Sequence, residues 1–152
     1  MHTQDVLGTI RSYASSVKQI PEPVRVLVVD DDAHVRSVVE RVLRTAGYET
    51  ASAPGGHEAL ALASTAPGGF QLVVTDVRMP YMSGPQLVER LRRSERDLKV
   101  LYLTGYNDQL FSEKTRLWED EAFLDKPCTM NGLIEAVSLL LHGRISPSNR
   151  AA

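Results

Sequence analysis

The chain has 152 residues, 43% of them hydrophobic and 24% charged, and a formal net charge of −2. This length suits one domain with a real core, and the charge gives no reason to expect nucleic-acid binding. No apolar run approaches the roughly 20 residues that span a bilayer, and the first residues lack a secretory signal pattern. A single cysteine, Cys128, excludes an intramolecular disulfide. We therefore expect a cytoplasmic protein that binds neither nucleic acid nor a membrane.

Residues 1–23 are expected to form an N-terminal helical extension that ends in a proline linker. Apolar residues recur at helical spacing over 3–20, and Pro21 and Pro23 then interrupt the pattern. The apolar face of this segment consists of Val6, Ile10, Tyr13 and Val17. An isolated helix of this length is marginal, so we expect this face to pack on the rest of the chain or to pair with a second copy. A homodimer is therefore one of two alternatives.

From Val24 onward, strand-like and helix-like segments alternate in the sequence. Strands are predicted at 24–30, 48–53, 70–76, 99–104 and 121–125, and helices at 33–46, 56–65, 84–94, 107–118 and 130–141. Five such units in a row predict an α/β domain over 24–142, with an open five-stranded parallel sheet and helices on both faces. Residues 143–152 are expected to be a polar tail.

Burial within this sheet can also be predicted from the pattern of apolar residues. The segments 24–30, 70–76 and 99–104 are continuously apolar, as expected of central strands covered on both faces, whereas 48–53 and 121–125 are polar enough for edges. The sequence from Ser83 to Gln86 predicts a capping box at the start of the third helix. The first helix should bury one side, formed by Val35, Val38, Val39, Val42, Leu43 and Ala46.

Three aspartates stand where predicted strands end. Asp30 and Asp31 follow the first strand, and Asp76 ends the third. Ligands of open α/β sheets bind at the carboxyl ends of the strands. At about 4 Å and an effective dielectric constant of 20, each pair of carboxylates repels by about 4 kcal/mol, which a bound cation relieves. Oxygen ligands around an open site favour Mg²⁺.

Two further residues at strand ends suggest phosphate chemistry. Thr104 ends the fourth strand, and Lys126 follows the fifth. An aspartate can act as a nucleophile toward phosphorus, and the transferred phosphoryl group then needs neutralisation by a metal, an ammonium and a hydroxyl. Mg²⁺, Lys126 and Thr104 could supply these groups. Spacing alone leaves open which carboxylate is the nucleophile.

Four motifs narrow this choice. The sequences "VLVVDDD", "VVTDVRMPYMSG", "VLYLTGY" and "AFLDKP", in this order, closely resemble the bacterial response-regulator receiver domain over about residues 24–142. The resemblance implies a flavodoxin-like (βα)5 fold in which Asp76 accepts a phosphoryl group. It also implies that Mg²⁺ is held by Asp30, Asp31, Asp76 and the backbone carbonyl of Arg78.

The resemblance has further implications for switching and partners. Thr104 and Lys126 would bind the phosphoryl group, the bond from Lys126 to Pro127 would be cis, and Thr104 and Phe123 would form a two-position switch that shifts the helix at 107–118. The phosphoryl group would come from a histidine kinase or a phosphotransfer protein, and the output would be altered binding to a downstream protein that the sequence does not identify. The module would be a stand-alone regulator or an associate of a hybrid kinase. It would be no enzyme beyond catalysing its own phosphorylation and dephosphorylation.

Two other interpretations stay open. The sequence Asp30-x-Asp32 fits the Asp-x-Asp motif of haloacid-dehalogenase-like phosphatases, although their later acidic ligands are not evident. The third possibility is a receiver-fold scaffold that is never phosphorylated. Among nearby residues, Asp32 is expected to be a helix N-cap, His34 a solvated helix residue and Cys128 a small buried hydrophobe.

Overall fold

The computed structural model describes residues 22–105 and 120–143. The helices predicted at 3–20 and 107–118, and the tail beyond Gly143, lie outside the described residues. The remaining predicted elements are all present. They are β1 (Arg25–Val29), α2 (Ala33–Thr45), β2 (Glu49–Ala53), α3 (Gly56–Thr65), β3 (Leu72–Asp76), α4 (Gly84–Leu91), β4 (Lys99–Thr104), β5 (Glu121–Asp125) and α5 (Met130–His142).

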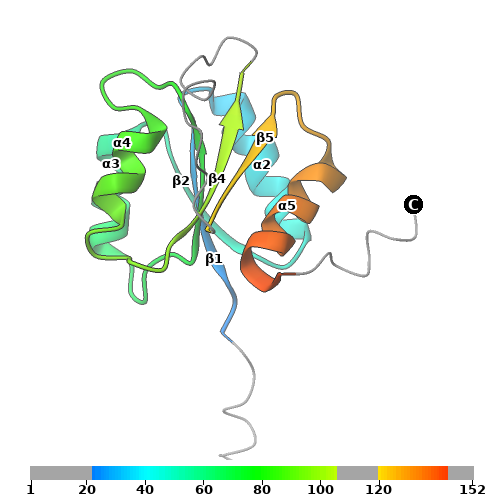
Figure 1. Cartoon of the computed structure of the whole chain (residues 1–152), viewed down its shortest axis with the longest axis horizontal. Coiled ribbons are helices and arrows are strands. Elements are labelled where there is room, and N and C mark those ends of the chain that lie inside the picture. Colours follow the sequence, from blue (N-terminus) through cyan, green and yellow to red (C-terminus); the bar gives the residue numbers. More distant parts are fainter. Residues whose placement is uncertain (1–21, 106–119, 144–152) are drawn as a thin grey trace, which may run out of the picture.

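The strands form one parallel sheet in the order β2-β1-β3-β4-β5. Helices α3 and α4 cover one face, and α2 and α5 cover the other (Figure 1). This confirms the predicted α/β fold. Strand β2 lies on one side of β1, and β3 lies on its other side. The order of the strands therefore reverses direction between β1 and β3. A crevice at the carboxyl ends of these two strands is where such a sheet binds ligands.

The central strands are buried on both faces, because alternate residues of a strand point to opposite sides of the sheet. In β1, Leu27 and Val29 join the apolar cluster under α3 and α4, whereas Val26 and Val28 join the cluster under α2 and α5. All five residues of β3 are buried. Strands β2 and β5 lie at the edges, as their more polar sequences predict.

Several strand and helix ends differ from the predictions by one or two residues, and larger differences occur at α4 and on the face of α2. Helix α4 ends at Leu91 rather than at residue 94, because the backbone N–H groups of Arg93 and Ser94 donate to carbonyls three residues back and form a turn. Val38 and Ala46, which were expected on the buried side of α2, are exposed. The covered face of α2 is therefore narrower than its run of apolar residues suggests, and Val38 is 44% exposed.

Within residues 22–105 and 120–143, no helix combines the length and the apolar character that crossing a membrane requires.

Candidate functional site

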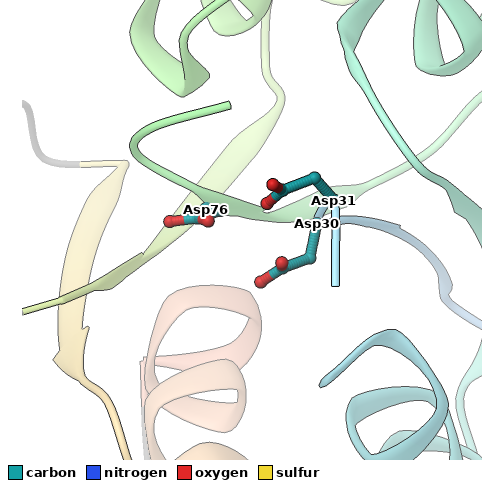
Figure 2. A group of neighbouring side chains, drawn as sticks. All are labelled: Asp30, Asp31 and Asp76. Carbon is teal, nitrogen blue, oxygen red and sulfur yellow. The ribbon is translucent and has the colours of Figure 1, made fainter. Parts of the chain in front are cut away.

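Three carboxylates meet at the carboxyl ends of β1 and β3. Val29 pairs in register with Thr75, so the next residues along the two strands, Asp30 and Asp76, come side by side. Asp31 follows directly. Each of the three aspartates offers an oxygen within 4.8 Å of the others, and Figure 2 shows the side chains gathered in one place. The structure thus brings together the three aspartates that the sequence places at strand ends.

The carboxylate of Asp30 is fixed through both of its oxygens. Its Oδ1 atom accepts from the backbone N–H of Asp32 at 2.9 Å, and its Oδ2 atom accepts from Nζ of Lys126 at 2.9 Å. The side chain of Arg36 donates to the Asp30 carbonyl at 2.6 Å. Asp30 is almost fully buried, whereas Asp31 beside it is exposed. One aspartate is therefore held rigidly, and its neighbour faces solvent.

Lys126 connects β5 to the aspartates. It follows the last residue of β5 directly, and its peptide bond to Pro127 is cis. Its Nζ atom lies 2.9 Å from Oδ2 of Asp30 and 3.3 Å from Oδ2 of Asp76. Burial by itself would lower the pKa of Lys126, but the hydrogen bonds and negative charges of the two aspartates outweigh it and raise the pKa. Lys126 therefore stays an ammonium at neutral pH.

Several interactions act in opposite directions on the pKa of the Asp76 carboxylate. Burial raises its pKa, and the charges of Asp30 and Asp31 act in the same direction, whereas Lys126 opposes them. The net pKa is raised above the usual value for an aspartate. The side chain keeps 12% of its surface exposed, so it remains in contact with solvent. Asp76 combines partial exposure with a direct ammonium contact.

The loop after Asp76 is held against the sheet by the start of α4. The backbone N–H of Gly84 donates to the Val77 carbonyl at 2.8 Å. Ser83 and Gln86 form the predicted capping box, in which each side chain accepts from the backbone N–H of the other. The hydroxyl of Thr75 donates to the Asp76 carbonyl at 2.9 Å. The backbone on both sides of the Asp76 carboxylate is thereby anchored.

Thr104 lies at the end of β4, next to β3, and is 8% exposed. Its hydroxyl donates to Oδ1 of Asp125 at 2.8 Å. The sequence alone suggested no role for Asp125. The signal that could have found it is its place directly before Lys126, at the end of a strand expected to run parallel to β4. Phe123, two residues earlier in β5, stacks on Tyr102 with ring centroids 5.3 Å apart.

Asp32 and His34 lie as expected beside this group, whereas Cys128 is less buried than predicted. Asp32 caps α2, since its Oδ1 atom accepts from the backbone N–H groups of His34 and Val35. His34 is exposed, and Cys128 is partly buried with a thiol pKa that burial raises. Beside the site lies a hollow of about 460 Å³ with a mostly apolar lining. This α2 hollow is lined by His34, Val35, Val38, Val39, Leu103, Gly105, Lys126, Pro127 and Cys128.

The charge balance of the site fits a hard divalent cation. Three carboxylates face one ammonium, so the group keeps an excess of negative charge. The donors are all oxygens, and exposed Asp31 leaves one side open to water, which suits Mg²⁺. The role of the Arg78 carbonyl as a further ligand stays a prediction.

The sequence of this chain is similar to those of known proteins. The family model described as the response regulator receiver domain matches residues 26–138. The response regulator MprA of Mycolicibacterium vanbaalenii is 38% identical over 132 residues, which cover 85% of this chain and 54% of MprA. The sensor kinase CckA of Brucella abortus is 34% identical over 116 residues, 76% of this chain but only 12% of the kinase. The chain thus matches one part of these longer relatives.

Solved structures agree with the sequence comparisons. The receiver domain from the hybrid histidine kinase CckA aligns with a TM-score of 0.66 and 35% identity, covering 78% of this chain and 99% of that domain. The chemotaxis protein CheY4 of Vibrio cholerae aligns with a TM-score of 0.70 and 30% identity, covering 79% of this chain and all of CheY4. Together with the family match, these likenesses show that the chain belongs to the response regulator receiver domain family of two-component systems.

Proposed function

We propose that Asp76 is the phosphoacceptor of this receiver domain and that Lys126 and Thr104 bind the transferred phosphoryl group. The observation that carries the proposal is the position of Asp76: it ends a central strand, keeps part of its carboxylate exposed and lies 3.3 Å from Nζ of Lys126. A buried neighbour, Asp30, shares the same ammonium. A carboxylate beside a fixed ammonium group is suited to attack phosphorus and to hold the transferred phosphoryl group.

The chemical step is a displacement at phosphorus. A carboxylate oxygen of Asp76 forms a P–O bond while the P–N bond of a phosphohistidine breaks, and the electron pair of that bond leaves with the imidazole. The product is an acyl phosphate on Asp76. Lys126 can follow the phosphoryl oxygens with its ammonium, because its Nζ atom is already within 3.3 Å of the acceptor carboxylate. The Thr104 hydroxyl is the second group proposed to bind these oxygens.

Asp30, Asp31 and Asp76 are the residues that would hold Mg²⁺, with the backbone carbonyl of Arg78 as a further ligand. When bound, the cation supplies positive charge against the phosphoryl oxygens. Asp30 and Asp31 differ in how firmly they are held. Lys126 and the backbone N–H of Asp32 donate hydrogen bonds to Asp30, whereas Asp31 faces solvent and can adjust its position.

Receiver domains interact with histidine kinases or phosphotransfer proteins. We propose the α2 hollow as the place where such a donor packs, because it is apolar and shares Lys126 with the acidic site. The partner that reads the phosphorylated state, the homodimer and the cytoplasmic location expected from the sequence remain predictions. So does the absence of enzymatic activity beyond the chain's own phosphorylation and dephosphorylation.

The phosphatase interpretation receives less support. It needs Asp32 as a working carboxylate, but Asp32 is occupied as the N-cap of α2 and is not part of the carboxylate group around Asp76 within the described residues. Membership of the receiver family also argues against it. The unphosphorylated scaffold is disfavoured because Lys126 contacts both Asp30 and Asp76, and the three aspartates lie close together.

The test is phosphorylation by a small donor. Incubation with acetyl phosphate and Mg²⁺ should add one phosphoryl group by intact mass, and hydroxylamine should remove it. Asp76→Asn should abolish the gain, whereas Asp97→Asn, an exposed aspartate just before β4 at the other end of the sheet, should leave it intact. Equal labelling of Asp76→Asn would refute the assignment. Turnover of a generic phosphate ester would favour the phosphatase instead.

A further inference from the structure

The bond between Thr104 and Asp125 is built into the pairing of β4 and β5. The two residues are direct partners in the parallel register, and the backbone N–H of Lys126 donates to the Thr104 carbonyl at 2.8 Å. The Thr104 hydroxyl donates to Oδ1 of Asp125 at 2.8 Å, a normal length for a hydrogen bond to a carboxylate. The backbone of the sheet therefore presents the Asp125 carboxylate to the Thr104 hydroxyl.

The same face of the sheet carries a second contact one step earlier along both strands. Tyr102 pairs with Phe123 in register, and their rings stack with an interplanar angle of 21°. Side chains two residues apart in a strand point to the same face, so the aromatic stack and the Thr104–Asp125 bond are successive rungs of one ladder. The Thr104–Asp125 bond therefore lies next to Phe123, the residue expected to respond when Thr104 moves.

A threonine hydroxyl carries one hydrogen and can donate it to one acceptor at a time. Donation to Asp125 therefore excludes donation to a phosphoryl oxygen on Asp76. A carboxylate is a strong acceptor, so this bond is a competitor that the phosphoryl group has to displace. Asp125 is exposed, so water can solvate its carboxylate when the Thr104 hydroxyl no longer donates to it.

We propose that Asp125 is a positioning residue that holds the Thr104 hydroxyl in the unphosphorylated domain and thereby opposes capture of the phosphoryl group. This inference rests on the proposed role of Asp76 as phosphoacceptor. In this proposal, Asp125 shifts the equilibrium of the domain toward the unphosphorylated state. Removing the carboxylate frees the hydroxyl, so a phosphoryl group or its mimic should bind more tightly without any new contact.

The experiment measures the affinity of the Mg²⁺-loaded protein for beryllofluoride, a mimic of the phosphoryl group. Asp125→Ala should bind it several-fold more tightly than the wild type, up to about tenfold for one hydrogen bond released from competition. Asp125→Asn keeps an uncharged acceptor and should fall between the two. Asp97→Ala removes the same charge just before β4, at the other end of the sheet, and should match the wild type.

A second arm separates the hydrogen bond from simple charge repulsion. Thr104→Val keeps the shape of the side chain and removes the hydroxyl, so Asp125→Ala should have no effect in that background. If Asp125→Ala raises the affinity for beryllofluoride equally with and without the Thr104 hydroxyl, the proposal is overturned. Asp125 would then act only through its charge and not through its hydrogen bond to Thr104. In the metal-free protein, Asp125→Ala should also shift the Thr104 methyl resonance, and an unmoved resonance would overturn the proposal too.

The outcomes for the two proposals are distinct. Beryllofluoride binding by the wild type with no response to Asp125→Ala would overturn the role of Asp125 and leave the phosphoacceptor standing. Failure of the wild type to bind beryllofluoride, with no acetyl phosphate labelling of Asp76, would overturn both.

Discussion

Gly84 lies so close to Asp76 that a Cβ atom on Gly84 would overlap the carbonyl oxygen of Asp76 and approach its carbonyl carbon to 3.2 Å. The neighbour is backbone rather than a flexible side chain, so it cannot move aside without moving the end of β3. The start of α4 is thereby packed directly under the proposed phosphoacceptor. Glycine is required at this position by close approach.

Gly84→Ala should therefore disturb the site as well as the fold. We expect a lower Tm and a slower rate of labelling by acetyl phosphate, because the carboxylate of Asp76 moves with its backbone. Gly47→Ala is the matched control: Gly47 has a φ of +97°, and a Cβ atom added there would meet nothing within 4 Å, so alanine strains only the backbone. If Gly47→Ala slows labelling as much as Gly84→Ala does, loss of stability rather than displacement of Asp76 explains both.

Mg²⁺ should stabilise the protein, because a cation that binds the folded acidic site relieves repulsion among its carboxylates. At a concentration about tenfold above Kd, the gain is about 1.4 kcal/mol, which is a rise of a few degrees in Tm. Asp31→Asn should remove most of this rise, and it should not lower Tm in EDTA, since Asp31 is exposed and its charge repels the other two carboxylates. Thermal unfolding with and without Mg²⁺ measures both. A full rise in Asp31→Asn would exclude Asp31 from the metal site.

Asp32→Ala should separate the helix cap from the metal ligands. Asp32 accepts two backbone hydrogen bonds at the start of α2, so its loss should lower the free energy of unfolding by about 1 kcal/mol. The rise in Tm with Mg²⁺ and labelling by acetyl phosphate should both survive. Urea unfolding combined with intact mass provides the test. Loss of metal binding in Asp32→Ala but not in Asp31→Asn would show that the assigned register of the acidic pair is off by one residue.

Asp76→Asn should stabilise the metal-free protein at neutral pH. The pKa of Asp76 is raised in the folded state, chiefly by burial, above its ordinary value of 3.8. A group with a raised folded pKa adds stability below its unfolded pKa and loses that contribution as the pH rises through the folded pKa. At pH 7 the charged carboxylate is therefore a cost that asparagine removes. In EDTA, the gain in Tm should be present at pH 7 and shrink as the pH falls toward 4, and a gain that grows at low pH would contradict this.

The parts of the site that depend on strand order could be predicted from the sequence, and the parts that depend on side-chain direction could not. Apolar runs that stop at Asp30 and Asp76 reveal two strand ends, and parallel strands bring such ends together. The place of Asp125 directly before Lys126 hints at the partner of the Thr104 hydroxyl, but the register of β5 against β4, which decides the partner, is a property of the folded sheet. Likewise, the valines of α2 share a helical period, but how far α5 and the sheet cover them is a tertiary property, so the helical period does not predict the exposure of Val38.

Val38 is expected to contact the phosphoryl donor. Val38 lines the α2 hollow beside Lys126, whereas Leu139 on α5 is similarly exposed, at 48%, and does not line the hollow. Val38→Gln replaces an apolar side chain by a polar one without adding charge, so labelling by acetyl phosphate should be unchanged because this small donor needs no docking surface. Transfer from the histidine kinase that phosphorylates the wild type fastest should slow, because less apolar surface is buried on docking. Leu139→Gln should transfer at the wild-type rate. Equal transfer to Val38→Gln and the wild type, measured by radiolabelled phosphoryl transfer at donor concentrations below saturation, would show that the donor packs elsewhere.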